Sequence, residues 1–146
     1  KVVLLAKECI DPTTLTQGSR ENKIAFSTTN YWADDFTSDP YDLTETGVPD
    51  ESHYAARAAY DYGLKVGGKG RLMTYKECKG IEKLGESDIY AMLYGFGNFW
   101  LSAAHDTDNV WEMEGNNAGY NWGNTNYVSG VRPVVEISKS KVTKVQ

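Results

Sequence analysis

The order of segments along the chain constrains its fold more than any other feature of the sequence. Helical patterns lie between Asp50 and Leu84, and strand-like runs separated by polar turns follow from Asn98 onward. Segregation of helices from strands along a sequence is typical of α+β domains, since regular alternation would instead build a parallel sheet. At 146 residues the chain has the length of one domain with its own core. We therefore expect a single α+β domain over residues 1–146.

Two helices are predicted by local signals. The first follows Asp50 or Ser52, either of which can cap a helix start, and has acidic residues in its first turn and apolar side chains at helical spacing. The second begins at Thr74, because Thr74 and Glu77 match the capping box, in which the two residues bond each other's free amides. We expect this second helix to reach about Leu84 and Ser87–Tyr94 to add a short helical turn.

Strand-like runs occur at both ends of the chain and in its second half. Lys1–Ile10 predicts a first strand, and Tyr127–Ser138 predicts a last one, in which Pro133 requires an edge or bulged position. Asn98–Ala103 and Asn109–Glu114 predict neighbouring strands joined by a polar turn. Together these runs predict small antiparallel sheets in which the two terminal strands are free to pair.

Other segments carry few signals of regular structure. Lys23–Ser27 predicts a short strand, and Thr28–Asp50 predicts a long irregular loop anchored by aromatic side chains. Gly67–Gly70 predicts a flexible turn. Asn116–Asn126 contains so many Asn and Gly residues that we expect no regular element there.

The charge distribution argues against nucleic-acid binding. Fifteen basic residues stand against twenty acidic ones, and neither Lys nor Arg occurs between Lys23 and Arg57 or between Lys83 and Arg132. Binding to a phosphate backbone depends on basic side chains that displace counterions. Because the aromatic segments are acidic, we expect no nucleic-acid partner.

Signals for metals and cofactors are weak. Cys9 and Cys78 form no CxxC pair and have no nearby His, so no zinc site is predicted, and their redox state stays open. Carboxylates in loops offer the hard oxygen ligands that calcium prefers, although none matches an EF-hand loop. We expect no cofactor and leave a structural calcium ion open. The candidate calcium ligands are Asp34, Asp35, Asp39, Asp42, Asp106 and Asp108.

Two residue pairs represent the enzyme alternative. A hydrolase triad would need a histidine beside a nucleophile and an orienting acid, and Ser102 lies near His105-Asp106 in sequence, in an expected exposed turn. Glu112 and Glu114 project from the same face of a strand, as a glycosidase could use. The sequence does not support a pocket that gathers a base and an oxyanion site for either pair. His53, the other histidine, is expected to be a solvated residue in a first helical turn. We therefore expect a protein without enzymatic activity.

Asparagine and aromatic side chains concentrate late in the chain. Seven of the nine Asn residues lie at or beyond Asn98, interleaved with Trp and Tyr. Asn both donates and accepts hydrogen bonds, and Trp and Tyr give rigid contact area at low entropic cost, a mixture typical of adaptable binding surfaces. Trp100, with apolar neighbours, is expected in the core, whereas Trp111 could lie in the core or on the binding surface. We predict these ligand contacts: Trp111, Glu112, Asn116, Asn117, Tyr120, Asn121, Trp122, Asn124 and Tyr127.

Several motifs resemble those of a known protein family. Phe99–Ala103 (FWLSA), Asn109–Trp111 (NVW) and Gly130–Val134 (GVRPV) are similar to motifs in the C-terminal domains of surface and pilin-like proteins from gut Firmicutes. Arg71–Glu77 (RLMTYKE) and Phe26–Trp32 (FSTTNYW) resemble upstream elements of the same proteins. The resemblance covers nearly the whole chain.

This resemblance implies a branch of the C-type-lectin-like fold, related to formylglycine-generating enzymes and to the variable proteins of diversity-generating retroelements. It implies two helices, paired terminal strands, long irregular loops, a ligand surface before the last strand and a structural role for Arg132. The calcium and sugar motifs of sugar-binding lectins are absent from this sequence. Cys9 and Cys78 also do not match the paired active-site cysteines of formylglycine-generating enzymes.

Three functions follow as hypotheses. The first is a secreted or cell-surface adhesion module that binds a protein or glycan, with an Asn-rich segment of the kind that retroelements diversify, because adenine-directed mutagenesis acts on Asn codons. The second is the structural head of a type IV pilin or pseudopilin-like subunit, attached to a membrane or pilus through a segment upstream of Lys1. The third, a hydrolase, has the least support.

Overall fold

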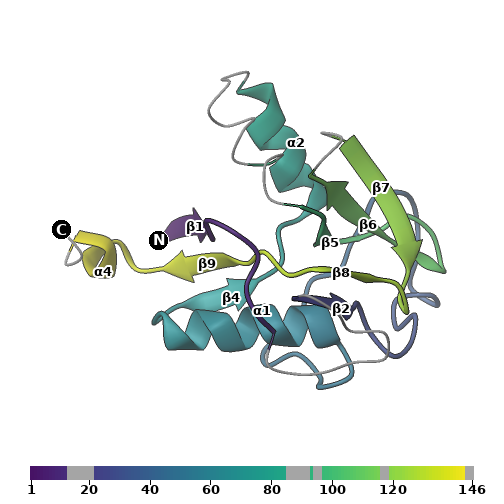
Figure 1. The fold of residues 1–146 in the computed structure, drawn as a ribbon, viewed down its shortest axis with the longest axis horizontal. Helices are drawn as coiled ribbons and strands as arrows, with labels where there is room; N and C mark the ends of the chain where they lie inside the picture. The colour runs from purple at the N-terminus through teal and green to yellow at the C-terminus, as the bar shows by residue number, and fades with distance from the viewer. Residues whose placement is uncertain (13–21, 85–92, 94–96, 116–118, 144–146) are drawn as a thin grey trace.

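The helices lie around the outside of the strands (Figure 1). The structure, a computed structural model, describes residues 1–12, 22–84, 93, 97–115 and 119–143. The described elements confirm the α+β class that the sequence predicts. The predicted helical segment Ser87–Tyr94 falls outside the described residues except for Leu93.

The smaller sheet joins the two ends of the chain. Its strands are β1 (Val2–Leu5), β9 (Val134–Ile137) and β4 (Lys69–Arg71), in the antiparallel order β1-β9-β4. The predicted pairing of the terminal strands is thus confirmed. The predicted strand Lys1–Ile10 is too long, because the chain leaves the sheet after Leu5. Beyond Leu5, the Ala6 and Ile10 amides each donate a single backbone bond to the last segment.

The larger sheet forms the centre of the molecule. Its strands are β2 (Lys23–Ala25), β8 (Val128–Gly130), β5 (Phe99–Ala104), β6 (Asn109–Glu114) and β7 (Gly119–Asn124), in the order β2-β8-β5-β6-β7. The short β3 (Tyr41–Asp42) also pairs with β5, within the otherwise irregular loop. The sequence predicts antiparallel sheets, but this sheet is mixed, because β5 and β8 run parallel where Phe99 meets Gly130.

Two predictions about the late segments are wrong. Asn116–Asn126 is not irregular throughout, since β7 pairs with β6 over six consecutive residues and its aromatic side chains pack against that partner. Tyr127–Ser138 is not one strand but two, β8 and β9, which belong to different sheets (Figure 1). The break falls at Arg132, whose side chain is buried, and at Pro133, which lacks the amide that a sheet ladder needs.

The helices differ in how they begin. In α2 (Tyr75–Lys83) the predicted capping box is present: Thr74 Oγ1 accepts from the Glu77 amide at 3.1 Å, and Glu77 Oε1 accepts from the Thr74 amide at 2.9 Å. The start predicted for α1 (Tyr54–Lys65) is wrong, because its N-cap is His53, without a side-chain cap and without acidic residues in the first turn. A further short helix that the sequence did not reveal, α4 (Lys139–Thr143), follows β9.

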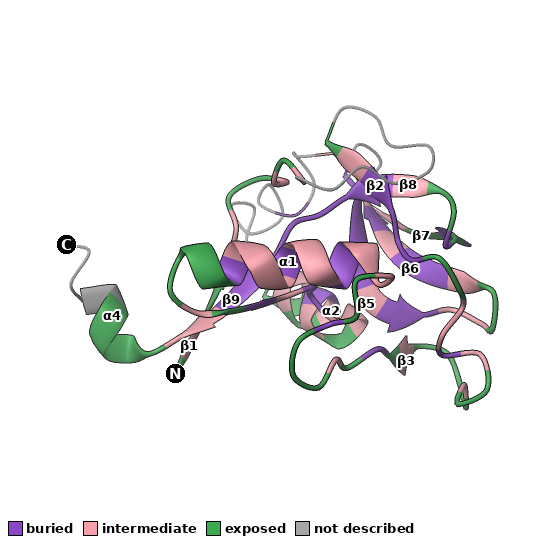
Figure 2. Ribbon diagram, turned by 90° about the horizontal axis from the view of Figure 1, so that it is seen from below, coloured by how far each residue is buried: buried purple, intermediate pink, exposed green. Residues whose placement is uncertain are grey.

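Many residues of β5 and β6 are buried (Figure 2), and core clusters lie on both faces of the larger sheet. One face packs Trp100 and Phe26 against Ala59 of α1, and the other packs Met113 against Cys78 of α2. Trp100 is 1% exposed and its indole nitrogen donates to the Ile24 carbonyl at 3.0 Å, which confirms its predicted place in the core. Core side chains therefore pack on both faces of β6.

Candidate ligand-binding surface

The register of β6 and β7 divides the predicted contact residues between two faces. Trp111 lies opposite Trp122, and Glu112 lies opposite Asn121. Because neighbouring side chains of a strand point to opposite faces, these two pairs face away from each other. Trp111, Tyr120, Trp122 and Asn124 thus share one face, and Glu112 and Asn121 share the other.

The first face carries a cluster of rings that we call the aromatic surface, made of Tyr75, His105, Trp111, Tyr120 and Trp122. Tyr75, from the first turn of α2, lies 4.9 Å from Trp111 and 4.8 Å from Tyr120 between ring centroids. His105, from the turn between β5 and β6, lies 4.9 Å from Trp111. Three separate segments of the chain therefore build one continuous set of rings.

Trp122 is the exposed member of the aromatic surface. Trp122 is 45% exposed, whereas Trp111 is only 8% exposed. The imidazole of His105 stacks on Trp122 at 4.0 Å with an interplanar angle of 9°, and Trp111 meets it nearly at right angles at 5.3 Å. Trp122 is thus held by two protein rings while nearly half of its surface stays exposed to solvent.

Carboxylates hold the buried side of the aromatic surface in place. Asp39 Oδ1 accepts from the indole nitrogen of Trp111 at 2.7 Å, and its other oxygen lies 3.9 Å from His105 Nε2. Asp106 Oδ2 lies 2.8 Å from His105 Nδ1, and both of its oxygens accept from the Asn109 amide. These bonds fix the orientation of His105 and so of the ring stacked on it.

The other end of the aromatic surface combines a cation with a carboxylate. The Lys79 ammonium lies 4.2 Å from the centroid of Tyr120 and 5.5 Å from that of Tyr75. It also lies 3.7 Å from Glu82, which accepts a hydrogen bond from the Tyr120 hydroxyl. Tyr120 therefore has structural partners on both its ring and its hydroxyl group.

The opposite face of β6 and β7 is more polar. Asn121 donates to Glu112 at 3.5 Å, and burial raises the pKa of Glu112. Tyr127, 57% exposed, packs its ring against Gly123 on this side of β7. Glu114 points to the same face as Glu112, as the sequence predicts. This face is a separate surface from the one that carries Trp122.

Sequence reasoning found part of the aromatic surface. It named Trp111, Tyr120 and Trp122, but it missed Tyr75 and Asp39, which come from distant segments and give no local signal of their position. His105 was considered only as a catalytic residue, although its place in the turn next to β6 could have indicated proximity to β7. Two further predicted contacts lie outside the described residues: Asn116 and Asn117.

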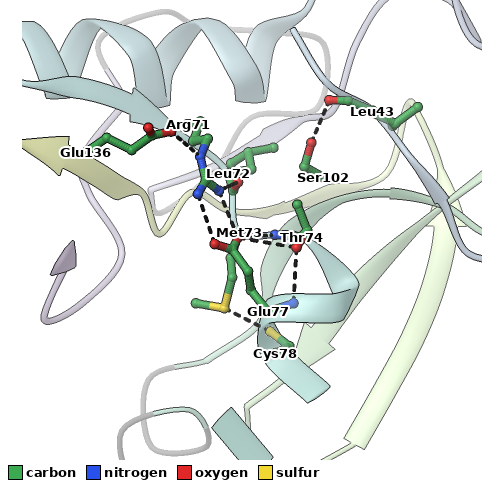
Figure 3. Close-up of polar contacts among 9 residues, drawn as sticks. All are labelled: Leu43, Arg71, Leu72, Met73, Thr74, Glu77, Cys78, Ser102 and Glu136. Atoms are coloured by element: carbon green, nitrogen blue, oxygen red, sulfur yellow. Dashed lines mark hydrogen bonds and ion pairs between the residues drawn. The ribbon is translucent and has the colours of Figure 1, made fainter. Parts of the chain in front are cut away.

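A cavity of about 240 Å³ lies between α1, β4 and the loop after β3. Figure 3 shows several of its residues and their bonds: Arg71 donates to Glu136, the Ser102 hydroxyl donates to the Leu43 carbonyl at 2.7 Å, and Thr74 belongs to the capping box. These polar groups are already engaged in structural bonds, which makes the cavity a weaker candidate for recognition than the aromatic surface.

The expectation that His53 is solvated is wrong. Its ring stacks on Tyr31 at 3.6 Å, and its Nδ1 lies 2.8 Å from Glu45 Oε1. Burial, followed by the charge of Glu45, raises the pKa of Tyr31. His53 thus ties the loop after β3 to the start of α1.

The two residues considered for a hydrolase, Ser102 and His105, lie in different surroundings. The Ser102 hydroxyl donates to the Leu43 carbonyl in the wall of the cavity, whereas His105 bonds to Asp106 and stacks on Trp122. No group of three or more His, Cys, Asp or Glu side chains among the described residues is arranged to hold a metal ion. Along the same part of the chain, no helix has both the length and the apolar character needed to cross a membrane.

Comparison with protein-family models gives no match for this chain, and comparison with curated proteins gives no match either.

Proposed function

We propose that this protein is a recognition module that binds a protein or glycan outside the cell through the aromatic surface. The observation that carries the proposal is the exposed indole of Trp122, held in one orientation by His105 and Trp111. An aromatic ring that is rigid before binding loses little entropy when a ligand covers it. Exposed, preorganised Trp side chains are therefore effective anchors in binding sites.

The amide side chains near Trp122 support the same proposal. Asn124 ends β7 on the face of Trp122, opposite Asn109, and it is exposed. An amide beside an aromatic platform can give and accept hydrogen bonds that orient a ligand. Trp122 would supply most of the contact area, and Asn124 would contribute to specificity.

We further propose that the fold belongs to the C-type-lectin-like class. Three features support this assignment: the pairing of β1 with β9, the presence of α1 and α2, and the position of β6 and β7 before the last strand. In such a fold the segment before the last strand forms the ligand surface, which is where the aromatic surface lies.

The test is a binding screen on arrays of glycans and of cell-surface proteins. We expect the protein to bind at least one ligand and Trp122→Ala to weaken that binding about tenfold or more, because the anchor ring is lost. Tyr127→Ala is the matched control, since it removes an exposed ring from the opposite face. Both variants must keep the thermal melting of the parent protein.

Two results would contradict the proposal. Absence of binding to every arrayed ligand would remove the support for a recognition module. A loss of binding in Tyr127→Ala with none in Trp122→Ala would move the site to the face of Glu112 and Asn121.

A further inference from the structure

Two carboxylates lie close to Trp122, at the His105 ring on which its indole stacks. Asp39 and Asp106, which lie 3.9 Å and 2.8 Å from nitrogens of that ring, have side chains that are 41% and 39% exposed. The segments that bring these residues together contain no Lys or Arg, since none occurs from Ile24 to Ala56 or from Leu84 to Val131. The platform around Trp122 therefore combines an aromatic face with a local excess of negative charge.

The protein already binds one of its own cations on the aromatic surface. Lys79 lies over the ring of Tyr120, within the distance at which a cation is attracted to the negative face of an aromatic ring, and Glu82 lies beside it. This arrangement of ring, cation and carboxylate occupies the end of the surface at α2. At the other end, Trp122 offers a larger ring and nearby carboxylates, and it is exposed.

We infer that Trp122 binds a cationic side chain, an arginine or lysine presented by a protein partner. This inference rests on the proposed function, because it names the ligand class for the same site. Trp attracts cations more strongly than Tyr or Phe. The planar guanidinium of arginine can also stack in parallel on an indole, as the His105 ring does on the other side.

Charge separates this ligand class from the alternatives. A neutral sugar ring could also stack on Trp122, but it would gain little from the charges of Asp39 and Asp106. An anionic ligand would be repelled by them. The cationic side chain is the occupant that uses both the ring and the acidic surroundings.

The experiment uses nuclear magnetic resonance of the whole chain and follows the indole N–H signals of its four Trp residues. The probes are arginine amide, lysine amide, citrulline amide and N-acetylglucosamine at equal ionic strength. Citrulline amide has the shape of arginine amide but lacks the side-chain charge. We expect a saturable shift of the Trp122 signal with arginine amide and lysine amide, and none with citrulline amide.

Variants test the two contributions separately. In Trp122→Ala, the indole N–H signal of Trp111, the other Trp of the aromatic surface, should show no saturable shift with arginine amide or lysine amide. Asp39→Asn keeps an acceptor for Trp111 and removes one charge, and it should weaken arginine amide binding about two- to fivefold. Asp11→Asn, an exposed carboxylate beside α1, is the matched control and should leave the binding unchanged.

The outcomes distinguish this inference from the proposed function. If an arrayed ligand binds in a Trp122-dependent manner but arginine amide and lysine amide shift no Trp122 signal, the cation inference fails and the recognition function stands. A Trp122 shift with citrulline amide or N-acetylglucosamine of equal affinity would also overturn it, the latter in favour of a glycan. Equal responses in Trp122→Ala and the parent protein would reveal non-specific charge attraction. If no arrayed ligand and no probe responds, both proposals fail.

Discussion

At the scale of single residues, Arg132 shows how a buried charge can serve a structural role. Its side chain is 1% exposed, its Nε donates to the Ala6 carbonyl at 2.9 Å, and its guanidinium lies 5.4 Å from the Phe99 ring. Its Nη2 also donates to the Lys7 carbonyl at 3.3 Å. Arg132 thus holds the segment after β1 where the chain crosses from β8 to β9, which agrees with the structural role that the family resemblance implies.

Replacing Arg132 by Met should lower the free energy of unfolding by about 3 kcal/mol, because the Ala6 and Lys7 carbonyl groups lose their charged donor. Chemical denaturation measures this loss. Lys76→Met is the matched control, since it removes a positive charge from the exposed side of α2 and should change stability by less than about 0.5 kcal/mol. Equal stability of the two variants would show that Arg132 contributes no more than a surface charge.

At the scale of elements, the contact between α1 and β4 depends on two glycines. A Cβ atom at Gly70 would overlap the Ala59 carbonyl oxygen, and one at Gly63 would overlap the backbone nitrogen of Gly70. The predicted flexible turn at Gly67–Gly70 therefore describes this segment only in part. Gly70 lies in β4, and its missing side chain lets the helix approach the strand closely. Close packing, in addition to flexibility, explains why glycine occurs here.

A pair of Gly→Ala variants separates these two roles of glycine. Gly70→Ala should destabilise the protein by about 3 kcal/mol or more, since helix and strand must move apart. Gly80→Ala, in α2 with open space around it, should stabilise by about 0.5–1 kcal/mol through helix propensity. Thermal and urea unfolding check both signs. A Gly70→Ala variant as stable as the parent would show that α1 and β4 can adjust without cost.

At the scale of the whole molecule, Arg71 connects the smaller sheet to α2. It extends from β4, and its guanidinium pairs with Glu136 of β9 at 2.8 Å and with Glu77 of α2 at 2.8 Å (Figure 3). The hydrogen bond from Arg71, followed by that from Lys1, lowers the pKa of Glu136 from its ordinary value of 4.5 to about 2. Arg71 also lowers the pKa of Glu77.

These lowered pKa values predict a dependence of stability on pH. A carboxyl group with a lower pKa in the folded state stabilises that state above its unfolded pKa, and the contribution is lost as protons bind. The stability difference between the parent and Arg71→Met should therefore be largest near neutral pH and should shrink as pH falls from about 4.5 towards 2. Urea unfolding across this range measures it. A difference that stays constant with pH would exclude coupling through these carboxylates.

The sequence by itself determined the features that depend on neighbouring residues. The capping box at Thr74 fixed the start of α2, because both of its hydrogen bonds close within one helical turn. Strand-like runs and a polar turn located β5 and β6, and apolar neighbours placed Trp100 in the core. The concentration of Asn, Trp and Tyr also located part of the candidate surface.

Only the tertiary structure decided which of these side chains lie together. The Asn-rich segment becomes β7 because β6 supplies its hydrogen bonds and packing partners, which no local propensity reports. The strand register then places Trp122, and not Asn121, on the face of Trp111. Tyr75 and Asp39 join the aromatic surface from remote segments, since their positions depend on how α2 and the loop before β3 pack on the sheet.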